Sequence, residues 1–168
     1  MIKKYNKKGI GLIEVIAALG LSVVVLTSLV SLSVFTVRSS LQSKLMLEGS
    51  KIANREMELI RAFRDGSDYW YSDVEPTAFL NSILSCTGVG NNTCYMDYNT
   101  LTVVQGAKGY IGTGAKQLIR YFYATDIDGN PLVTSDTVVR ISVVVSWNVG
   151  SITKYARLYT DLTNWENK

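Results

Sequence analysis

The hydrophobic positions of this chain follow three different patterns, and the first is an uninterrupted apolar run. From Val15 to Val37 there is no charged residue, and the 23 positions are dominated by Val, Leu, Ile, Ala and Ser. About 20 helical residues cross a hydrocarbon core of about 30 Å, so the run predicts a membrane-spanning helix. Four lysines and no acid lie within residues 1–9. The positive-inside rule then predicts a cytoplasmic N-terminus and an extracytoplasmic remainder.

The second pattern begins at Arg38, where apolar residues recur at the spacing of an amphipathic helix. They are Leu45, Ile52, Ala53, Met57, Ile60 and Phe63. No proline occurs before Pro76, and the pattern ends at residues 65–68, which read Asp-Gly-Ser-Asp. We therefore expect one helix over about residues 10–64, apolar all round in its first half and packed on a globular domain in its second.

The third pattern is the period-two alternation of strands in the C-terminal half. Residues 117–124, 137–147 and 152–162 are predicted strands, separated by turns at residues 126–131 and 148–151. In the middle strand, one face carries Val139, Ile141, Val143, Val145 and Trp147. In the last strand, Ile152, Ala156, Leu158 and Leu162 are expected on one face and Tyr155, Arg157 and Tyr159 on the other. The predicted fold class is α+β, with the long N-terminal helix packed on a small antiparallel sheet.

Glu14 is the single acid at the N-terminal end of the predicted apolar helix. A carboxylate near the centre of a bilayer costs about 2.5–3.5 kcal/mol, so a charge kept in such a segment usually has a partner. The plain alternative is an acid that reaches the membrane surface. Glu14 lies four residues after Ile10, about 6 Å along a helix, where water can reach it.

The segment Lys8-Gly9-Ile10-Gly11-Leu12-Ile13-Glu14-Val15 resembles the class III leader of type IV prepilins and pseudopilins. In that family, a prepilin peptidase cuts after the glycine on the cytoplasmic side and N-methylates the new first residue. The resemblance implies cleavage between Gly9 and Ile10 and N-methylation of Ile10. Two positions differ from the usual form, because Ile10 stands where Phe or Met is commoner and Gly11 where Thr is common.

The resemblance also assigns roles to the residues around the cleavage point. Lys7, Lys8, Leu12 and Ile13 would be read by the peptidase as part of the leader motif. Glu14, at the fifth mature position, would pair with the N-terminal amine of a neighbouring subunit and fix the stagger between subunits. Residues 53–61 and 138–165 give further support, because they resemble the helix before the globular domain and the last hairpin of minor pilins.

The expected domain organisation follows from these patterns. It comprises a cleaved basic leader (1–9), a transmembrane assembly helix (10–37), an amphipathic continuation (38–66) and an extracytoplasmic β-rich domain (67–168). The resemblance implies a minor pilin or pseudopilin in the cytoplasmic (inner) membrane or a surface pilus. Its partners would be the bilayer, other pilin subunits, the peptidase, and the assembly platform with its ATPase. The alternative is a single-span, membrane-anchored binding module that does not polymerise.

Cys86 and Cys94, the only cysteines, fall on the predicted exported side, where a disulfide is the default expectation. In a reducing compartment they would instead be two small buried thiols. The chain has no histidine, which disfavours a two-cysteine metal site. Residues 126–130, Asp-Ile-Asp-Gly-Asn, invite comparison with a calcium loop but lack the rest of its ligand series, so a β-turn is favoured. No metal or cofactor is expected.

Catalysis finds little support, because the chain has no histidine, nucleophile motif or phosphate-binding loop. We therefore expect a protein that is not an enzyme. The side chains sum to +3, but removal of residues 1–9 takes away four lysines and leaves −1. This balance predicts no direct nucleic-acid binding, although a local basic patch stays open. The aromatic residues 69–71 are expected in the domain core rather than in an adhesive contact.

Overall fold

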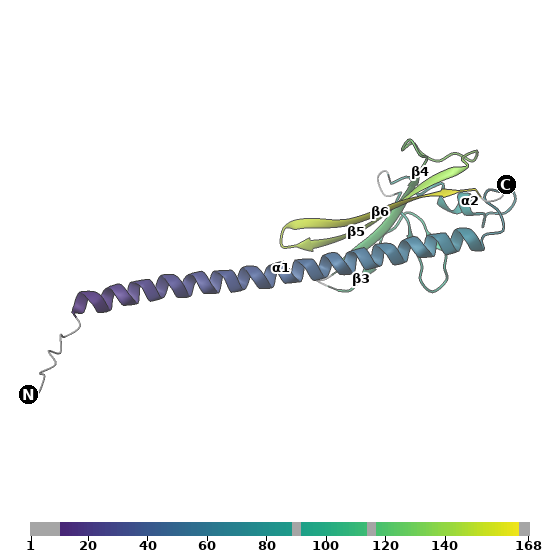
Figure 1. Cartoon of the computed structure of the whole chain (residues 1–168). Coiled ribbons are helices and arrows are strands. Elements are labelled where there is room, and N and C mark those ends of the chain that lie inside the picture. Colours follow the sequence, from purple (N-terminus) through teal and green to yellow (C-terminus); the bar gives the residue numbers. More distant parts are fainter. Residues whose placement is uncertain (1–10, 89–91, 114–116, 165–168) are drawn as a thin grey trace, which may run out of the picture. The chain divides into compact units, whose positions relative to one another are not determined.

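The computed structural model describes residues 11–88, 92–113 and 117–164. The chain divides into two compact units, Met1–Ser43 and Lys44–Lys168, and helix α1 (Leu12–Gly66) runs through both. The second unit adds a short helix, α2 (Phe79–Ile83), and six strands. The long apolar helix and the small antiparallel sheet confirm the predicted α+β class (Figure 1).

Helix α1 is continuous from Leu12, two residues after the predicted start. It ends at Gly66, two residues beyond the predicted end. The hydroxyl of Ser67 donates to the carbonyl of Phe63 at 2.8 Å, so a carbonyl of the last turn is paired by a side chain rather than by the helix. The buried residues of α1 all lie in its C-terminal half, on one stripe: Gly49, Ala53, Glu56, Met57 and Ile60.

The main sheet has four antiparallel strands in the order β3-β4-β5-β6. These are β3 (Gly109–Ile111), β4 (Leu118–Thr125), β5 (Val138–Val149) and β6 (Ile152–Thr163). Strands β4, β5 and β6 confirm the three predicted strands, and β5 continues two residues further, so that the hairpin turn contains only Gly150 and Ser151. Gly150 has a φ of 63°, a left-handed conformation that glycine adopts without steric cost.

The core lies between the C-terminal half of α1 and one face of the sheet, here called the inner face (Figure 1). The five predicted inward residues of β5 are all buried. Trp147 packs so closely on Gly49 of α1 that a methyl group there would lie 2.7 Å from the indole ring. The glycine therefore lets the helix and the sheet approach each other.

The last strand follows its predicted pattern except at one end. Ala156 and Leu162 are buried and Leu158 packs against the core, whereas Ile152 is 59% exposed. Ile152 pairs with Val149 at the tip of the β5–β6 hairpin, where the residues on both strands are exposed. The inward and outward positions of β6 therefore alternate as predicted, but the core ends before the strand does.

The segment from residue 67 to 117 holds elements that the sequence did not predict. Besides α2 and β3, it forms a two-stranded sheet of β1 (Tyr95–Met96) and β2 (Val103–Val104). These strands have two or three residues each, too few for a period-two pattern to show. Cys94 also forms an isolated bridge with Phe122, which attaches this segment to β4.

Candidate functional site

The N-terminal part of α1 is an apolar surface without a partner within its own unit. Every described residue from Gly11 to Ser43 is exposed, including Leu19 at 61%, Leu29 at 55% and Phe35 at 69%. Within the part of the chain that the structure describes, α1 is the helix long and apolar enough to cross a membrane. Such a surface is stable in lipid or in a bundle of similar helices, because water would solvate it poorly.

Five hydroxyl groups of this surface are hydrogen-bonded within the helix. Each of five side chains donates to a carbonyl one turn earlier at 2.8–3.0 Å: Ser22, Thr27, Ser28, Ser33 and Thr36. An unpaired polar group in hydrocarbon costs several kcal/mol, so this pairing fits an apolar medium.

Glu14 lies in the first turn of α1, and its Oε2 accepts a hydrogen bond from the backbone N–H of Gly11 at 3.2 Å. Gly11 precedes the helix, so the carboxylate partly caps the helix in the way that a glutamate at the third helical position does. No basic group of the described residues lies within ion-pair distance of Glu14. Among the described residues, its hydrogen-bond donor is the backbone N–H of Gly11, and no cation accompanies it.

The remaining residues of the predicted leader are only partly placed. Leu12 and Ile13 are 78% and 79% exposed at the start of α1. Lys7, Lys8, Gly9 and Ile10 lie outside the described residues. Cleavage and methylation accordingly remain predictions.

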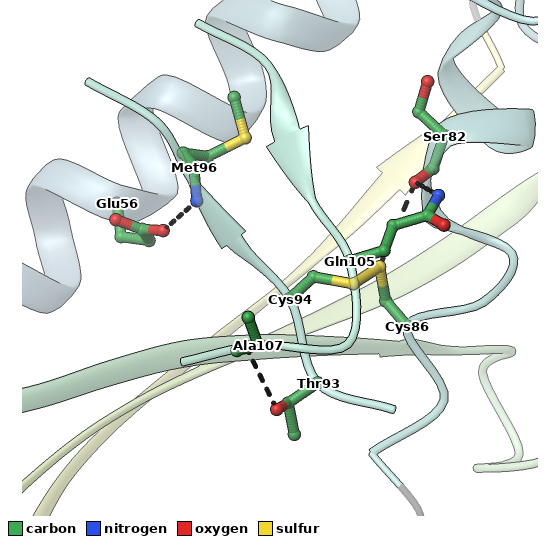
Figure 2. The surroundings of a disulfide bond; sticks show 8 residues. All are labelled: Glu56, Ser82, Cys86, Thr93, Cys94, Met96, Gln105 and Ala107. Atoms are coloured by element: carbon green, nitrogen blue, oxygen red, sulfur yellow. Dashed lines mark hydrogen bonds between the residues drawn. A yellow bond between two sulfur atoms is a disulfide. The ribbon is translucent and has the colours of Figure 1, made fainter. Parts of the chain in front are cut away.

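A buried ion pair inside the second unit was missed by the sequence analysis. Glu56 of α1 is fully buried, and its Oε2 pairs with Nη1 of Arg120 on β4, whose side chain is only 7% exposed. The other carboxylate oxygen accepts the backbone N–H of Met96 at 2.6 Å, as Figure 2 shows, while Arg120 Nη1 donates to the Met96 carbonyl at 2.8 Å. One ion pair thus joins α1, β1 and β4.

The surroundings of this pair are aromatic. The Arg120 guanidinium lies 3.7 Å from the ring centre of Tyr98, and Arg55 of α1 lies 4.1 Å from the same ring centre. Burial, followed by the negative charge of Glu56, raises the pKa of Tyr98 to about 12. The pKa of Glu56 is also raised, because burial outweighs the Met96 and Arg120 contacts that favour its charged form.

The sequence carried a signal for this pair. Position 56 lies on the apolar stripe of α1 with Ala53 and Ile60, and Arg120 alternates with Leu118 and Phe122, which face the core. A charged residue on each of two predicted inward faces indicates a buried pair, since an unpaired buried charge is costly. The sequence analysis assigned no role to residue 56.

Cys86 and Cys94 form the predicted disulfide, with their Cα atoms 5.5 Å apart. Both cysteines are fully buried, and the bond joins the segment after α2 to the start of β1 (Figure 2). Nearby, Thr93 donates to the Ala107 carbonyl at 3.3 Å, and Gln105 donates to the Ser82 carbonyl at 2.9 Å. These contacts hold together a region with little regular structure.

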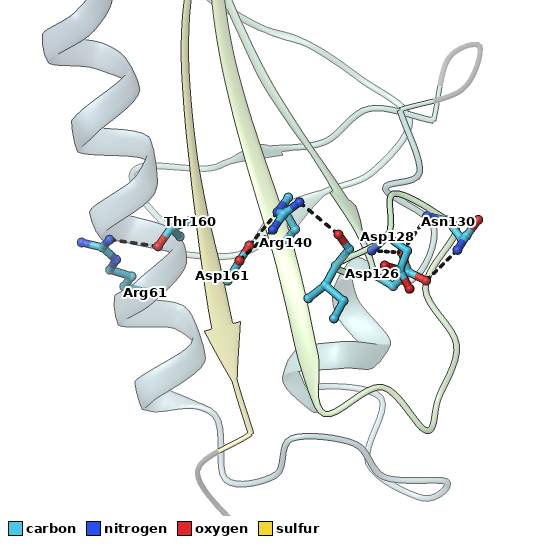
Figure 3. Close-up of polar contacts among 8 residues, drawn as sticks. Arg61, Asp126, Asp128, Asn130, Arg140, Thr160 and Asp161 are labelled. Carbon is cyan, nitrogen blue, oxygen red and sulfur yellow. Dashed lines mark hydrogen bonds and ion pairs between the residues drawn. The ribbon is translucent and has the colours of Figure 1, made fainter.

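Residues 126–130 form the predicted turn. A single oxygen of Asp126, Oδ1, accepts the backbone N–H groups of Asp128 at 2.9 Å and Asn130 at 2.7 Å, and Oδ2 accepts the Asn130 side chain at 3.0 Å (Figure 3). These donors lower the pKa of Asp126. The carboxylate is occupied by its own backbone, as in an Asx turn. Among the described residues there is no group of three or more metal-ligating side chains.

The aromatic residues after α1 divide between core and surface. Trp70 is buried, stacks 5.1 Å from Phe79 and donates from its indole nitrogen to the Asp136 carbonyl at 2.8 Å. Tyr69, in contrast, is 51% exposed. The core prediction is therefore confirmed for Trp70 and wrong for Tyr69, because the chain leaves α1 here and consecutive side chains point to opposite sides.

Comparison with protein-family models, curated proteins and solved structures gave no match to this chain. The functional argument accordingly depends on the residues themselves.

Proposed function

We propose that this chain is a minor pilin or pseudopilin of a type IV pilus or a related secretion or DNA-uptake filament. A prepilin peptidase would remove residues 1–9, and the mature subunit would wait in the membrane and join the filament through residues 10–37. Glu14 carries the proposal, because it is an acid with no cationic partner among the described residues, and it lies at the start of a helix whose apolar N-terminal part, up to Ser43, is exposed throughout. The amine of a cleaved neighbouring subunit would supply the missing positive charge.

The energetics favour assembly in one register. Pairing with an amine offsets much of the desolvation cost of Glu14 between helices, whereas an unpaired carboxylate in the bilayer costs about 2.5–3.5 kcal/mol. A wrong axial stagger would leave both charges unpaired. The pair thus contributes mainly to specificity, by penalising other registers.

Two substitutions in the full-length chain test this function. Gly9→Ala should block leader removal, so that the intact mass of the membrane form stays that of the chain beginning at Met1. Glu14→Ala should leave processing nearly unchanged but lower filament incorporation on the order of a hundredfold, the factor that about 2.5–3.5 kcal/mol implies. Glu48→Ala is the matched control, since it removes another exposed acid of the same helix.

A binding module that is anchored in the membrane and never polymerises is the second candidate. It is favoured by an open groove of about 610 Å³ between α1 and β3, lined by Lys51, Arg55, Tyr98 and Ile111 among others. The same two substitutions separate the candidates. A binding module would tolerate Glu14→Ala and would begin with Met1 in the functional protein.

A further inference from the structure

The outer face of the sheet, which is turned away from α1, is rich in tyrosines and cations. The register places Tyr110, Ile119, Ser146 and Tyr155 in one row, Tyr121, Val144 and Arg157 in the next, and Tyr123, Ser142 and Tyr159 in a third. Lys108, just before β3, approaches Tyr121 from the same side, at 5.1 Å from its ring centre. We call this surface the tyrosine face.

Three cations lie near the rings of the tyrosine face, and they differ in whether an acid neutralises them. Arg157 is 5.3 Å from the ring centre of Tyr155, and Arg140 is 5.9 Å from that of Tyr159. Arg140 is neutralised by Asp161, with Nε–Oδ1 and Nη2–Oδ2 distances of 2.7 and 2.9 Å (Figure 3). Lys108 and Arg157 have no acid within ion-pair distance among the described residues. The tyrosine face therefore presents two uncompensated positive charges among amphipathic rings.

The same unit carries a complementary acidic segment. Residues 65–107 contain five acids and no lysine or arginine. Three of the acids, Asp68, Asp73 and Glu75, are exposed in the loop between α1 and α2, here called the helix-end loop (residues 67–78). Val74 at the tip of this loop is 84% exposed. The loop thus offers an apolar side chain between two carboxylates.

We infer that the tyrosine face of one copy docks on the helix-end loop of a neighbouring copy of this chain. Tyrosine and arginine dominate protein interfaces because they bury large amphipathic surfaces and pair with polar groups. The two surfaces are different, so the contact is heterologous and extends from copy to copy without closing, as a filament requires. The inference rests on the proposed function, which brings many copies together.

Single-stranded nucleic acid is the other occupant that such residues could hold, since bases stack on tyrosines and phosphates meet arginine. The charge balance favours the acidic loop. The expected mature chain sums to −1, and the acidic segment on the same unit would repel a polyanion. The nucleic acid is therefore an outcome to be tested rather than the proposal.

The contact area sets the conditions of the experiment. The tyrosine face extends about 14 Å across from β3 to β6 and about 14 Å along the strands, from the usual strand spacing and rise. That is well below the area of about 800 Å² per partner in a stable complex. The contact would be weak in dilute solution and populated only where the helices hold the subunits together at high effective concentration. It should be measured in the membrane and the filament.

Photo-cross-linking in cells that express the full-length chain tests the inference. The exposed Tyr159 is replaced by the photoreactive amino acid p-benzoylphenylalanine, and cross-linked peptides are identified by mass spectrometry. We expect chain-to-chain cross-links that map to residues 65–78. Arg157→Glu or Glu75→Lys should each reduce their yield about tenfold, and the double variant Arg157→Glu/Glu75→Lys should restore it, since the charges are then exchanged. Lys51→Glu, an exposed charge reversal on α1, should leave the yield unchanged.

The outcomes separate this inference from the proposed function. If Glu14→Ala prevents incorporation while Arg157→Glu leaves the cross-links unchanged, the filament assignment stands and the docking contact is wrong. Cross-links outside residues 65–78, cross-links to nucleic acid, or failure of the double variant to recover the yield would also overturn the contact. If the chain keeps Met1 and tolerates Glu14→Ala, the proposed function fails, whatever the cross-links show.

Discussion

Replacement of Glu56 by leucine tests the buried ion pair, on which the attachment of β1 and β4 to α1 depends. The substitution leaves the Arg120 guanidinium, 7% exposed, without its counter-charge. Removal of one partner of a buried ion pair costs about 3–5 kcal/mol. The backbone N–H of Met96 also loses its acceptor, for about 1–3 kcal/mol more. We expect a loss of at least about 4 kcal/mol, a large part of the 5–15 kcal/mol that is typical of folded domains.

The double variant Glu56→Leu/Arg120→Met should recover part of this loss. It removes both charges together, and the remaining cost is confined to the two backbone groups of Met96 that lose their partners. Buried ion pairs can often be replaced by apolar residues at small cost, because the desolvation of both charges is relieved. We therefore expect the sum of the two single-variant losses in unfolding free energy to exceed the loss in the double variant by at least about 2 kcal/mol.

Urea unfolding of the full-length chain in detergent micelles, followed by tryptophan fluorescence, measures these differences. Trp70 and Trp147 are 2% and 4% exposed, so their emission reports on the unit that contains the pair. Glu58→Leu is the control: its exposed pair with Arg61, at 2.6 Å, should contribute less than about 1 kcal/mol. If the two single losses add to that of the double variant within about 0.5 kcal/mol, the coupling is absent and the reasoning is refuted.

Three further predictions use the same unfolding assay. Gly49→Ala should destabilise the protein by about 1–2 kcal/mol, because the new methyl group would overlap the ring of Trp147 and outweigh the gain in helix propensity. Replacement of Cys86 and Cys94 by serine should cost about 2–3 kcal/mol, the value for a short loop closed by a disulfide. Because burial raises the pKa of Glu56, the contribution of this group to stability should fall as the pH rises above 4.5 through its folded-state pKa, and Glu56→Gln should remove that slope.

Each of these predictions has its own control. Gly66→Ala should be tolerated, since a methyl group there meets no atom within 4 Å; an equal loss at both glycines would contradict the clash with Trp147. Addition of a reductant to the wild type should lower its free energy of unfolding to that of the serine variant. An unchanged free energy of unfolding in reductant would refute the stabilising role of the disulfide. Asp126 and Asp161 have lowered pKa values, so their contributions to stability rise with pH below 3.8, outside the window of Glu56.

The sequence predicted those elements whose periodicity is long enough to be unambiguous. Helix α1 and strands β4, β5 and β6 follow repeats of 8 residues or more, and the sequence located each of them to within two residues of its observed ends. The short elements α2, β1, β2 and β3 depend on contacts with distant segments, so no local sequence pattern predicts them. The candidate site divides in the same way, because Glu14 is visible as a charge at the edge of an apolar run.

Local patterns alone establish that an apolar helix carries an acid in its first turn and that an amphipathic helix is followed by an antiparallel sheet. Periodicity and charge are local properties of the chain, so they can be recognised in the sequence without the tertiary structure. Only the tertiary structure decided that Glu56 meets Arg120, that Gly49 receives Trp147, and that the tyrosines of three strands share one face with Lys108 and Arg157. Those contacts join residues 64 to 98 positions apart or depend on strand register, which is fixed only when the sheet packs on the helix.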